Sequence, residues 1–342
     1  MRVIDSHVHF PEDHLIDDGS HSRAGASGSP AGGNPAGGSP AGGNPAAEVH
    51  AAGTGYTSGP SVDRKAHPWI ETEKIRWAAA WRNPAPRKVS WPEGERLWRA
   101  EVEAREWLKS VVFVTTGSND DASALVARNP GIFMGYAHHD PLLPDAAERL
   151  ERALGPQAQG QGGLRGYKIL GPAIDRRLDD PSFYPLWEIA QAHGVPVLIH
   201  FGIMGGAGGI ANHVNINPII IHDVAKRFPH MPIIIPHFGC GYVFETLNLC
   251  WACPNVFVDT SGSNQWMRWM PYPIDLAALF RKYRETVGAS RIIFGTDSSW
   301  FPRGFAEAYL DDQVREMYDT GYSADEVDAV LYRNIAALLK VK

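Results

Sequence analysis

The chain has little cysteine, no long apolar run and no excess of positive charge. Its 342 residues include three cysteines, an odd number too small for a disulfide framework, which predicts a reducing, cytoplasmic compartment. The 32 Lys and Arg against 38 Asp and Glu give a net charge of −6, which argues against a nucleic-acid partner. No apolar run approaches the roughly 18 residues of a membrane-spanning helix, and the amino-terminal sequence does not resemble a signal peptide. We therefore expect neither a nucleic-acid nor a membrane partner.

Glycine and proline are concentrated in one segment, residues 23–60. Between Pro30 and Pro45 the units PAGGN and PAGGS repeat every five residues, and large apolar side chains are nearly absent. Such a composition cannot bury enough apolar surface to offset the entropy of ordering, so we expect a flexible excursion. The rest of the chain, with 44% hydrophobic residues overall, can build a large core.

A helical, tryptophan-rich segment follows over residues 63–109. The best candidate helices are Glu71–Trp81 and Glu93–Leu108, because bulky apolar residues recur there at helical spacing. The segment holds six tryptophans: Trp69, Trp77, Trp81, Trp91, Trp98 and Trp107. These side chains either pack in the core or at a contact in a homo-oligomer, or form a lid with aromatic walls. The prediction adopted for residues 63–109 is the helical lid.

Short β-branched runs alternate with helical stretches along the remaining sequence. The expected strands are Val3–Ser6, Val111–Thr115, Ile132–Ala137, Leu164–Leu170, Val195–His200, Ile233–His237, Val256–Asp259 and Ile292–Thr296. The expected helices include Phe183–His193, Pro218–Phe228, Ile274–Val287, Ala306–Met317 and Ala324–Leu339. Eight such units predict an α/β fold, a (β/α)8 TIM barrel in which the strands pair in parallel. The barrel forms one domain over residues 1–342, with residues 15–109 inserted in the first βα connection.

Ionisable side chains follow the carboxyl ends of several predicted strands. His7 and His9 are two residues apart, so an extended chain directs both imidazoles to one face. Lys168, His200, His237 and Asp297 lie at the same ends of other strands, where barrels place their chemistry. Imidazole and carboxylate groups are the ligands of zinc, iron and manganese. The set predicts a metal centre.

Several motifs resemble the amidohydrolase superfamily, in the branch of the amidohydrolase-related hydrolases and the aminocarboxymuconate-semialdehyde and resorcylate decarboxylases. They are DSHVHF (5–10), GYKIL (166–170), VPVLIHFG (195–202), FPHMPIIIPHFG (228–239), NVFVDTSGS (255–263) and RIIFGTDSSW (291–300). The resemblance implies that His7, His9, His200 and Asp297 hold a divalent ion, with His237 binding a second ion or acting as an acid or base. Lys168 is either carboxylated and bridges two ions or remains an ordinary cation, so one or two ions are expected, with zinc ahead of iron and manganese.

Three reactions are compatible with this resemblance. The leading one is hydrolysis of an ester, lactone or amide, in which Asp297 moves the proton and His237 polarises the carbonyl or protonates the product. The alternatives are non-oxidative decarboxylation of an aromatic or unsaturated acid and iron-dependent oxygenation of a hydrophobic substrate. In each case the expected partner is a hydrophobic or aromatic small molecule, contacted by His138, His139 and Trp300.

Overall fold

A computed structural model describes residues 1–11, 87–155, 163–203 and 211–341 of the chain. Its strands are β1 (Val3–His9), β2 (Leu108–Thr115), β3 (Phe133–Gly135), β4 (Ala137–His138), β5 (Tyr167–Leu170), β6 (Val197–His200), β7 (Ile233–Ile235), β8 (Val256–Asp259) and β9 (Ile292–Ile293). Neighbouring strands pair in parallel and in chain order, β1 to β3 in one sheet and β4 to β9 in a second.

Backbone hydrogen bonds connect the two sheets at both of their edges. β3 and β4 are one strand interrupted at Tyr136, whose N–H donates to the Phe113 carbonyl of β2 over 2.9 Å. On the other side, Val8 of β1 forms a parallel bridge with Ser298, beyond β9. The N–H of Asp297 also donates to the carbonyl of His7 over 2.9 Å. These contacts arrange the strands as a ring, and the predicted (β/α)8 architecture is confirmed.

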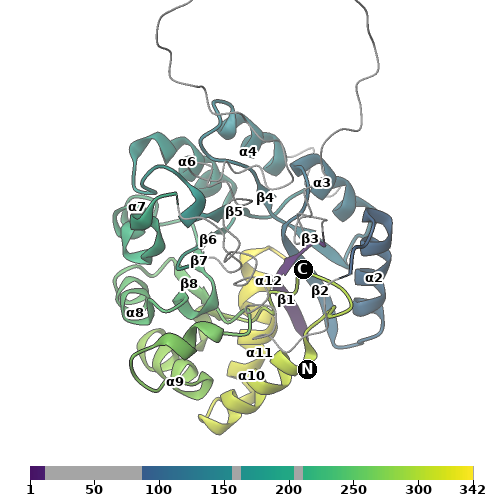
Figure 1. Cartoon of the computed structure of the whole chain (residues 1–342), viewed down its shortest axis with the longest axis vertical. Coiled ribbons are helices and arrows are strands. Elements are labelled where there is room, and N and C mark those ends of the chain that lie inside the picture. The colour runs from purple at the N-terminus through teal and green to yellow at the C-terminus, as the bar shows by residue number, and fades with distance from the viewer. Residues whose placement is uncertain (12–86, 156–162, 204–210, 342) are drawn as a thin grey trace, which may run out of the picture.

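Helices surround this ring in chain order (Figure 1). They are α2 (Trp91–Glu103), α3 (Asn119–Arg128), α4 (Ala146–Leu154), α6 (Tyr184–His193), α7 (His222–Arg227), α8 (Val243–Ala252), α9 (Leu276–Val287), α10 (Glu307–Asp319), α11 (Ala324–Asp328) and α12 (Asn334–Leu338). The helix expected over Ala324–Leu339 is divided by a π-helical turn, Ala329–Arg333. Within the described ranges, no helix combines the length and apolarity needed to cross a membrane.

The alternation of side chains along the strands separates an inner from an outer core. Val3 of β1 packs in a cluster with side chains of α2, α9 and α10, whereas the next residue, Ile4, belongs to a different cluster. That second cluster unites residues of several strands: Ile4, Val112, Met134, Leu198, Ile234 and Ile293. Ile335 of α12 packs against them. Successive residues of a strand point to opposite faces, which produces the two layers.

The described part of the predicted lid is a helix packed on the barrel. Trp98 of α2 has no exposed surface, and its ring lies 5.8 Å from that of Phe113 and 5.5 Å from that of Phe301. This corresponds to the core-packing alternative over residues 91–103. The helix ends at Glu103, before the predicted Leu108, because Leu108 pairs with Val3 in the sheet. The flexible segment 23–60, the helix Glu71–Trp81 and the first three tryptophans of the segment lie outside the described residues.

Candidate metal centre

The two histidines of β1 and the aspartate after β9 come together at one end of the strands. Nε2 of His9 lies 3.1 Å from Oδ1 of Asp297, and Nε2 of His7 lies 3.7 Å from the same oxygen. One ligand atom from each of the three residues falls within 4.8 Å of the others, the spacing of a metal-binding group. The structure therefore brings together three of the six predicted ligands, His7, His9 and Asp297.

Polar partners hold both of these imidazoles through Nδ1. Nδ1 of His7 donates to Oδ2 of Asp259 over 2.8 Å, and Nδ1 of His9 lies 2.5 Å from Oγ1 of Thr115. Burial, reinforced by the charge of Lys168, lowers the pKa of His7 to about 4, so its imidazole is neutral at pH 7. A neutral imidazole that donates at Nδ1 carries its lone pair at Nε2. His7 is thus prepared to act as a ligand through Nε2.

His237 and His200 extend the group of imidazoles. The ring centroid of His237 lies 5.2 Å from that of His7 and 5.1 Å from that of His200. Nδ1 of His237 lies 3.0 Å from the carbonyl oxygen of Ser261. Burial and the charge of His237 hold the pKa of His200 well below its usual value. These contacts place four histidines and one carboxylate in a single cluster.

This cluster fits a divalent metal ion. Nε2 of His7 and Nε2 of His200 are buried and have no hydrogen-bond partner in the described part of the chain. A buried polar atom without a partner carries a desolvation cost of about 1–3 kcal/mol, which coordination to a cation would remove. Neutral imidazoles with a carboxylate are donors that suit zinc, iron and manganese. The donor atoms of these residues thus suit such an ion.

The backbone is unusual at two members of the cluster. His237 has φ of 57° and Asp297 has φ of 56°, both in the left-handed region that non-glycine residues rarely occupy. Conformations of this kind persist only where the surrounding structure enforces them, and they gather at functional sites. His237 lies two residues after β7 and Asp297 lies four residues after β9, so in each case a left-handed residue in the loop beyond the strand directs the side chain.

Lys168 and His138 lie side by side on β5 and β4. The two residues are partners in the parallel ladder, and Nδ1 of His138 lies 3.2 Å from the carbonyl oxygen of Lys168. Lys168 is 1% exposed, and burial lowers its pKa to about 8, although the carboxylates of Asp259 and Asp297 oppose the shift. Burial likewise lowers the pKa of His138 to about 3, with a smaller contribution from His9. Both residues therefore lie within electrostatic reach of the cluster.

The structure does not bring His139 to the cluster. Nε2 of His139 lies 3.0 Å from the carbonyl oxygen of Ala146, and Nδ1 lies 3.1 Å from Nδ2 of Asn119. Both ring nitrogens are therefore used by the scaffold, which leaves none for the predicted contact with substrate. The predicted substrate contact Trp300 is buried, with the guanidinium of Arg303 4.7 Å from its ring centroid.

Sequence reasoning missed the residues that support the ligands. Asp259 is fully buried, and Ser261 contributes a hydroxyl 3.0 Å from Nδ1 of His7. Burial alone would raise the pKa of Asp259, but the charge and the hydrogen bond of His7 outweigh it and lower this pKa to about 2. Asp259 and Thr115 are the last residues of predicted strands, so the strand-end criterion that selected the ligands would also have selected these two.

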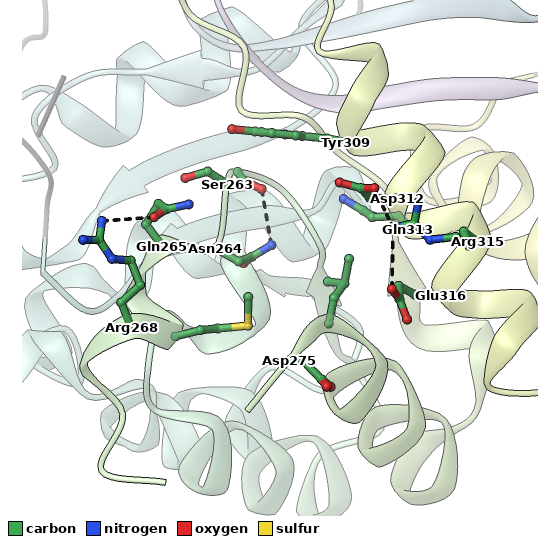
Figure 2. Close-up of a pocket in the computed structure, with 13 residues that line it drawn as sticks. Ser263, Asn264, Gln265, Arg268, Asp275, Tyr309, Asp312, Gln313, Arg315 and Glu316 are labelled. Carbon is green, nitrogen blue, oxygen red and sulfur yellow. Dashed lines mark hydrogen bonds and ion pairs between the residues drawn. The ribbon is translucent and has the colours of Figure 1, made fainter. Parts of the chain in front are cut away.

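A cavity of about 790 Å³ lies between the loop after β8 and helix α10 (Figure 2). It is lined by Gly262, Ser263, Asn264, Gln265, Met267, Arg268, Asp275, Leu276, Tyr309, Asp312, Gln313, Arg315 and Glu316. Most of these side chains are polar or charged, in contrast to the apolar walls expected for a hydrophobic substrate. A Cβ atom on Gly262 would lie 3.3 Å from Nδ1 of His237 and 3.4 Å from Oδ2 of Asp297. Gly262, which lines the cavity, therefore also lies close to the cluster.

Comparisons with known proteins agree with this geometry. The protein family described as amidohydrolase matches residues 4–341. No curated protein matches the chain at a significant level. An uncharacterised TIM-barrel protein from Bordetella bronchiseptica is similar in structure, with a TM-score of 0.57, 20% identity and coverage of 79% of this chain and 90% of that one.

Two further solved structures are similar. A dihydroxybenzoic acid decarboxylase from Polaromonas, solved with manganese and an inhibitor, has a TM-score of 0.53 and 18% identity, covering 79% of this chain and 94% of that one. A probable 2-pyrone-4,6-dicarboxylic acid hydrolase from Acinetobacter baumannii has a TM-score of 0.54 and 14% identity, covering 99% and 100%. At these identities the likeness concerns the fold.

Proposed function

The chain belongs to the amidohydrolase family, and we propose that it is a metal-dependent hydrolase of small esters, lactones or amides. One observation carries the proposal. Oδ1 of Asp297 faces the imidazoles of His9 and His7, whereas Oδ2 lies on the side of Gly262. A carboxylate placed in this way can contribute one oxygen to a metal centre and use the other for proton transfer.

In this proposal the ion is held by His7, His9, His200 and Asp297, and His237 acts as the acid or base beside it. The chemistry that a bound divalent cation supplies is Lewis acidity, which makes water more acidic and a carbonyl group more electrophilic. Zinc is the first choice for hydrolysis, and iron and manganese suit the same donors. Lys168, if carboxylated, would add ligand oxygens for a second ion.

Asp297 and His237 would handle the protons. Burial alone would raise the pKa of Asp297, but the hydrogen bond with His9 and the nearby histidines hold this pKa well below its usual value. The carboxylate is therefore ionised at neutral pH and accepts a proton from the attacking water, which it then delivers to the leaving group. His237, held at Nδ1 beside the Ser261 carbonyl, would hydrogen bond the substrate carbonyl through Nε2.

Decarboxylation is the second candidate function. It is favoured by the similarity to the Polaromonas decarboxylase and by an 18% identical 5-carboxyvanillate decarboxylase from Sphingomonas paucimobilis, with a TM-score of 0.51 and coverage of 71% of this chain and 82% of that one. Lys168 would then act as the buried cation that binds the substrate carboxylate. The buried position of Lys168 near the cluster suits this role as well as it suits carboxylation.

Metal analysis followed by two activity assays tests these alternatives. Protein purified without added metal is expected to contain about one equivalent of zinc or manganese, and a His7→Gln, His9→Gln double variant is expected to lose it. His222→Gln, at a half-buried imidazole outside the cluster, is the matched control and keeps the metal. Hydrolysis of a panel of esters, lactones and amides supports the first proposal, and release of carbon dioxide from hydroxybenzoates supports the second. Stoichiometric iron instead favours the oxygenase alternative, and a metal-free, inactive protein contradicts all three.

A further inference from the structure

Arg303, in the loop between β9 and α10, holds the backbone that carries Asp297. Its Nη1 donates to the carbonyl oxygen of Asp297 and its Nη2 to that of Thr296, each over 3.2 Å. A planar guanidinium can bind two neighbouring acceptors at once, which the ammonium of a lysine cannot do with the same geometry. Arg303 therefore fixes two consecutive carbonyl groups next to the proposed ligand.

The guanidinium is itself fixed by two aromatic rings. Its central carbon lies 4.7 Å from the ring centroid of Trp300 and 5.0 Å from that of Tyr309, which also lines the cavity. Both distances are within the range of a cation–π interaction. Among residues 1–11, 87–155, 163–203 and 211–341, no carboxylate lies within ion-pair distance of Arg303. The charge is thus directed at the ring faces and at the two carbonyl groups rather than at an acidic partner.

A second side chain binds the amide group of the same residue, Thr296. Asp5 of β1 accepts hydrogen bonds from the N–H of Thr296 over 2.9 Å and from its hydroxyl over 2.5 Å. Arg303 and Asp5 therefore bind the carbonyl and the amide side of one residue, immediately before Asp297 adopts φ of 56°. A left-handed conformation at a non-glycine residue needs this kind of enforcement.

We propose that Arg303 is a positioning residue of the metal centre, which keeps the carboxylate of Asp297 directed at His9 by holding the Thr296–Asp297 backbone. The proposal rests on the metal-binding role of Asp297 in the proposed function. Without the guanidinium, the two carbonyl groups lose their donors and the left-handed turn can relax. The carboxylate then spends less time in the position that completes the centre.

The test compares metal binding by variants of two arginines. Apo protein is titrated with Mn²⁺ by calorimetry, and the visible absorption of the Co²⁺-loaded protein reports the coordination of the ion. Arg303→Met is expected to raise the Kd for Mn²⁺ by about 10-fold or more and to change the Co²⁺ spectrum, as for other residues that support a ligand. Arg303→Lys, which retains the charge and a single donor nitrogen, is expected to be intermediate. Arg149→Met, at an exposed arginine paired with Asp145, is expected to leave both the Kd and the spectrum unchanged.

The outcomes separate this inference from the proposed function. A wild-type protein that binds neither Mn²⁺ nor Co²⁺ contradicts the proposed metal centre itself. A wild-type protein that binds both, with Arg303→Met indistinguishable from it in Kd and spectrum, overturns the role of Arg303. A lower unfolding temperature with unchanged Kd shows a structural role only and also overturns it. If Arg303→Met does not fold, the Kd and spectrum of Arg303→Lys decide in the same way.

Discussion

Asp259 at the end of β8 accepts a hydrogen bond from Nδ1 of His7 on β1, 252 positions earlier in the sequence, and both side chains are fully buried. The hydroxyl of Ser261 donates to the other carboxylate oxygen of Asp259 over 2.5 Å. A carboxylate that orients an imidazole in this way fixes its tautomer and increases its basicity as a ligand. We therefore expect the metal affinity of the proposed centre to depend on Asp259 as well as on the ligands.

Replacing this carboxylate tests that conclusion. Asp259→Asn is expected to raise the Kd for Mn²⁺ by about 10- to 100-fold, because the amide no longer enforces the tautomer of His7 with its lone pair at Nε2. Calorimetric titration of the apo protein measures the effect. Asp223→Asn is the matched control, since Asp223 pairs with Nδ1 of His222 over 2.9 Å but is 93% exposed. Equal affinities for the two variants would show that His7 does not depend on Asp259.

Asp297→Asn separates folding from activity. The amide has the shape of the carboxylate but cannot accept a proton at neutral pH, so turnover of any accepted substrate is expected to fall by about 10² or more. The far-ultraviolet circular dichroism spectrum is expected to remain that of the wild type. Turnover is measured with metal at saturating concentration, so that weaker binding does not account for the loss. An unchanged kcat would remove Asp297 from the proposed chemistry.

Gly262→Ala tests the close approach of the β8 loop to the cluster. Gly262 has φ of 84°, and the new Cβ atom would lie 3.3 Å from Nδ1 of His237 and 3.4 Å from Oδ2 of Asp297. We expect weaker Mn²⁺ binding together with a loss of about 1 kcal/mol in the free energy of unfolding. Gly131→Ala is the control, because Gly131 has φ of 79° but nothing within 4 Å of its Cβ position. The control variant should lose a similar free energy of unfolding and keep its Mn²⁺ affinity. A loss of Mn²⁺ affinity in both variants would show that the effect does not arise from the contact of Gly262 with the cluster.

The stability of the metal-free protein is expected to fall in acid, in part because of His139. Burial lowers the pKa of this imidazole from 6.5 to about 4. Between these values the unfolded chain binds a proton that the folded chain does not, so the stabilisation present above pH 6.5 is lost as the pH falls toward 4. The contribution amounts to about 3 kcal/mol. Urea unfolding of EDTA-treated protein between pH 4.5 and 7.5 measures it.

His139→Gln is the comparison for that experiment, because glutamine retains an amide donor for the Ala146 carbonyl but does not titrate. The slope of the free energy of unfolding against pH should be smaller in the variant. The difference corresponds to the uptake of at most one proton on unfolding. Because the difference between the two proteins cancels the contributions of the other titrating groups, parallel curves would exclude His139 as a source of acid lability.

The sequence was sufficient for the barrel and for the gathering of candidate ligands at strand ends. The two-residue period of a strand places His7 and His9 on one face, and the structure shows both beside Asp297. For the adjacent His138 and His139, the structure places His138 beside Lys168, whereas both ring nitrogens of His139 contact Ala146 and Asn119. The strand expected over Ile292–Thr296 ends at Ile293, as the following residues enter the turn held by Asp5 and Arg303. Such contacts depend on loop conformation and on residues far apart in the sequence, so no local pattern reveals them.

The pairing of β1 with the segment after β9 also determines when the centre can form during synthesis. Asp5 and Thr296 are separated by 291 positions, so β1 leaves the ribosome long before its partner on that side exists. Contacts at this sequence separation close late, because a very long loop must be ordered first. Until then, one edge of β1 offers unpaired backbone groups to other nascent chains. Competence to bind a metal ion thus reports that the last strand has docked, and a protein arrested before this step would lack the centre even if the preceding strands were already paired.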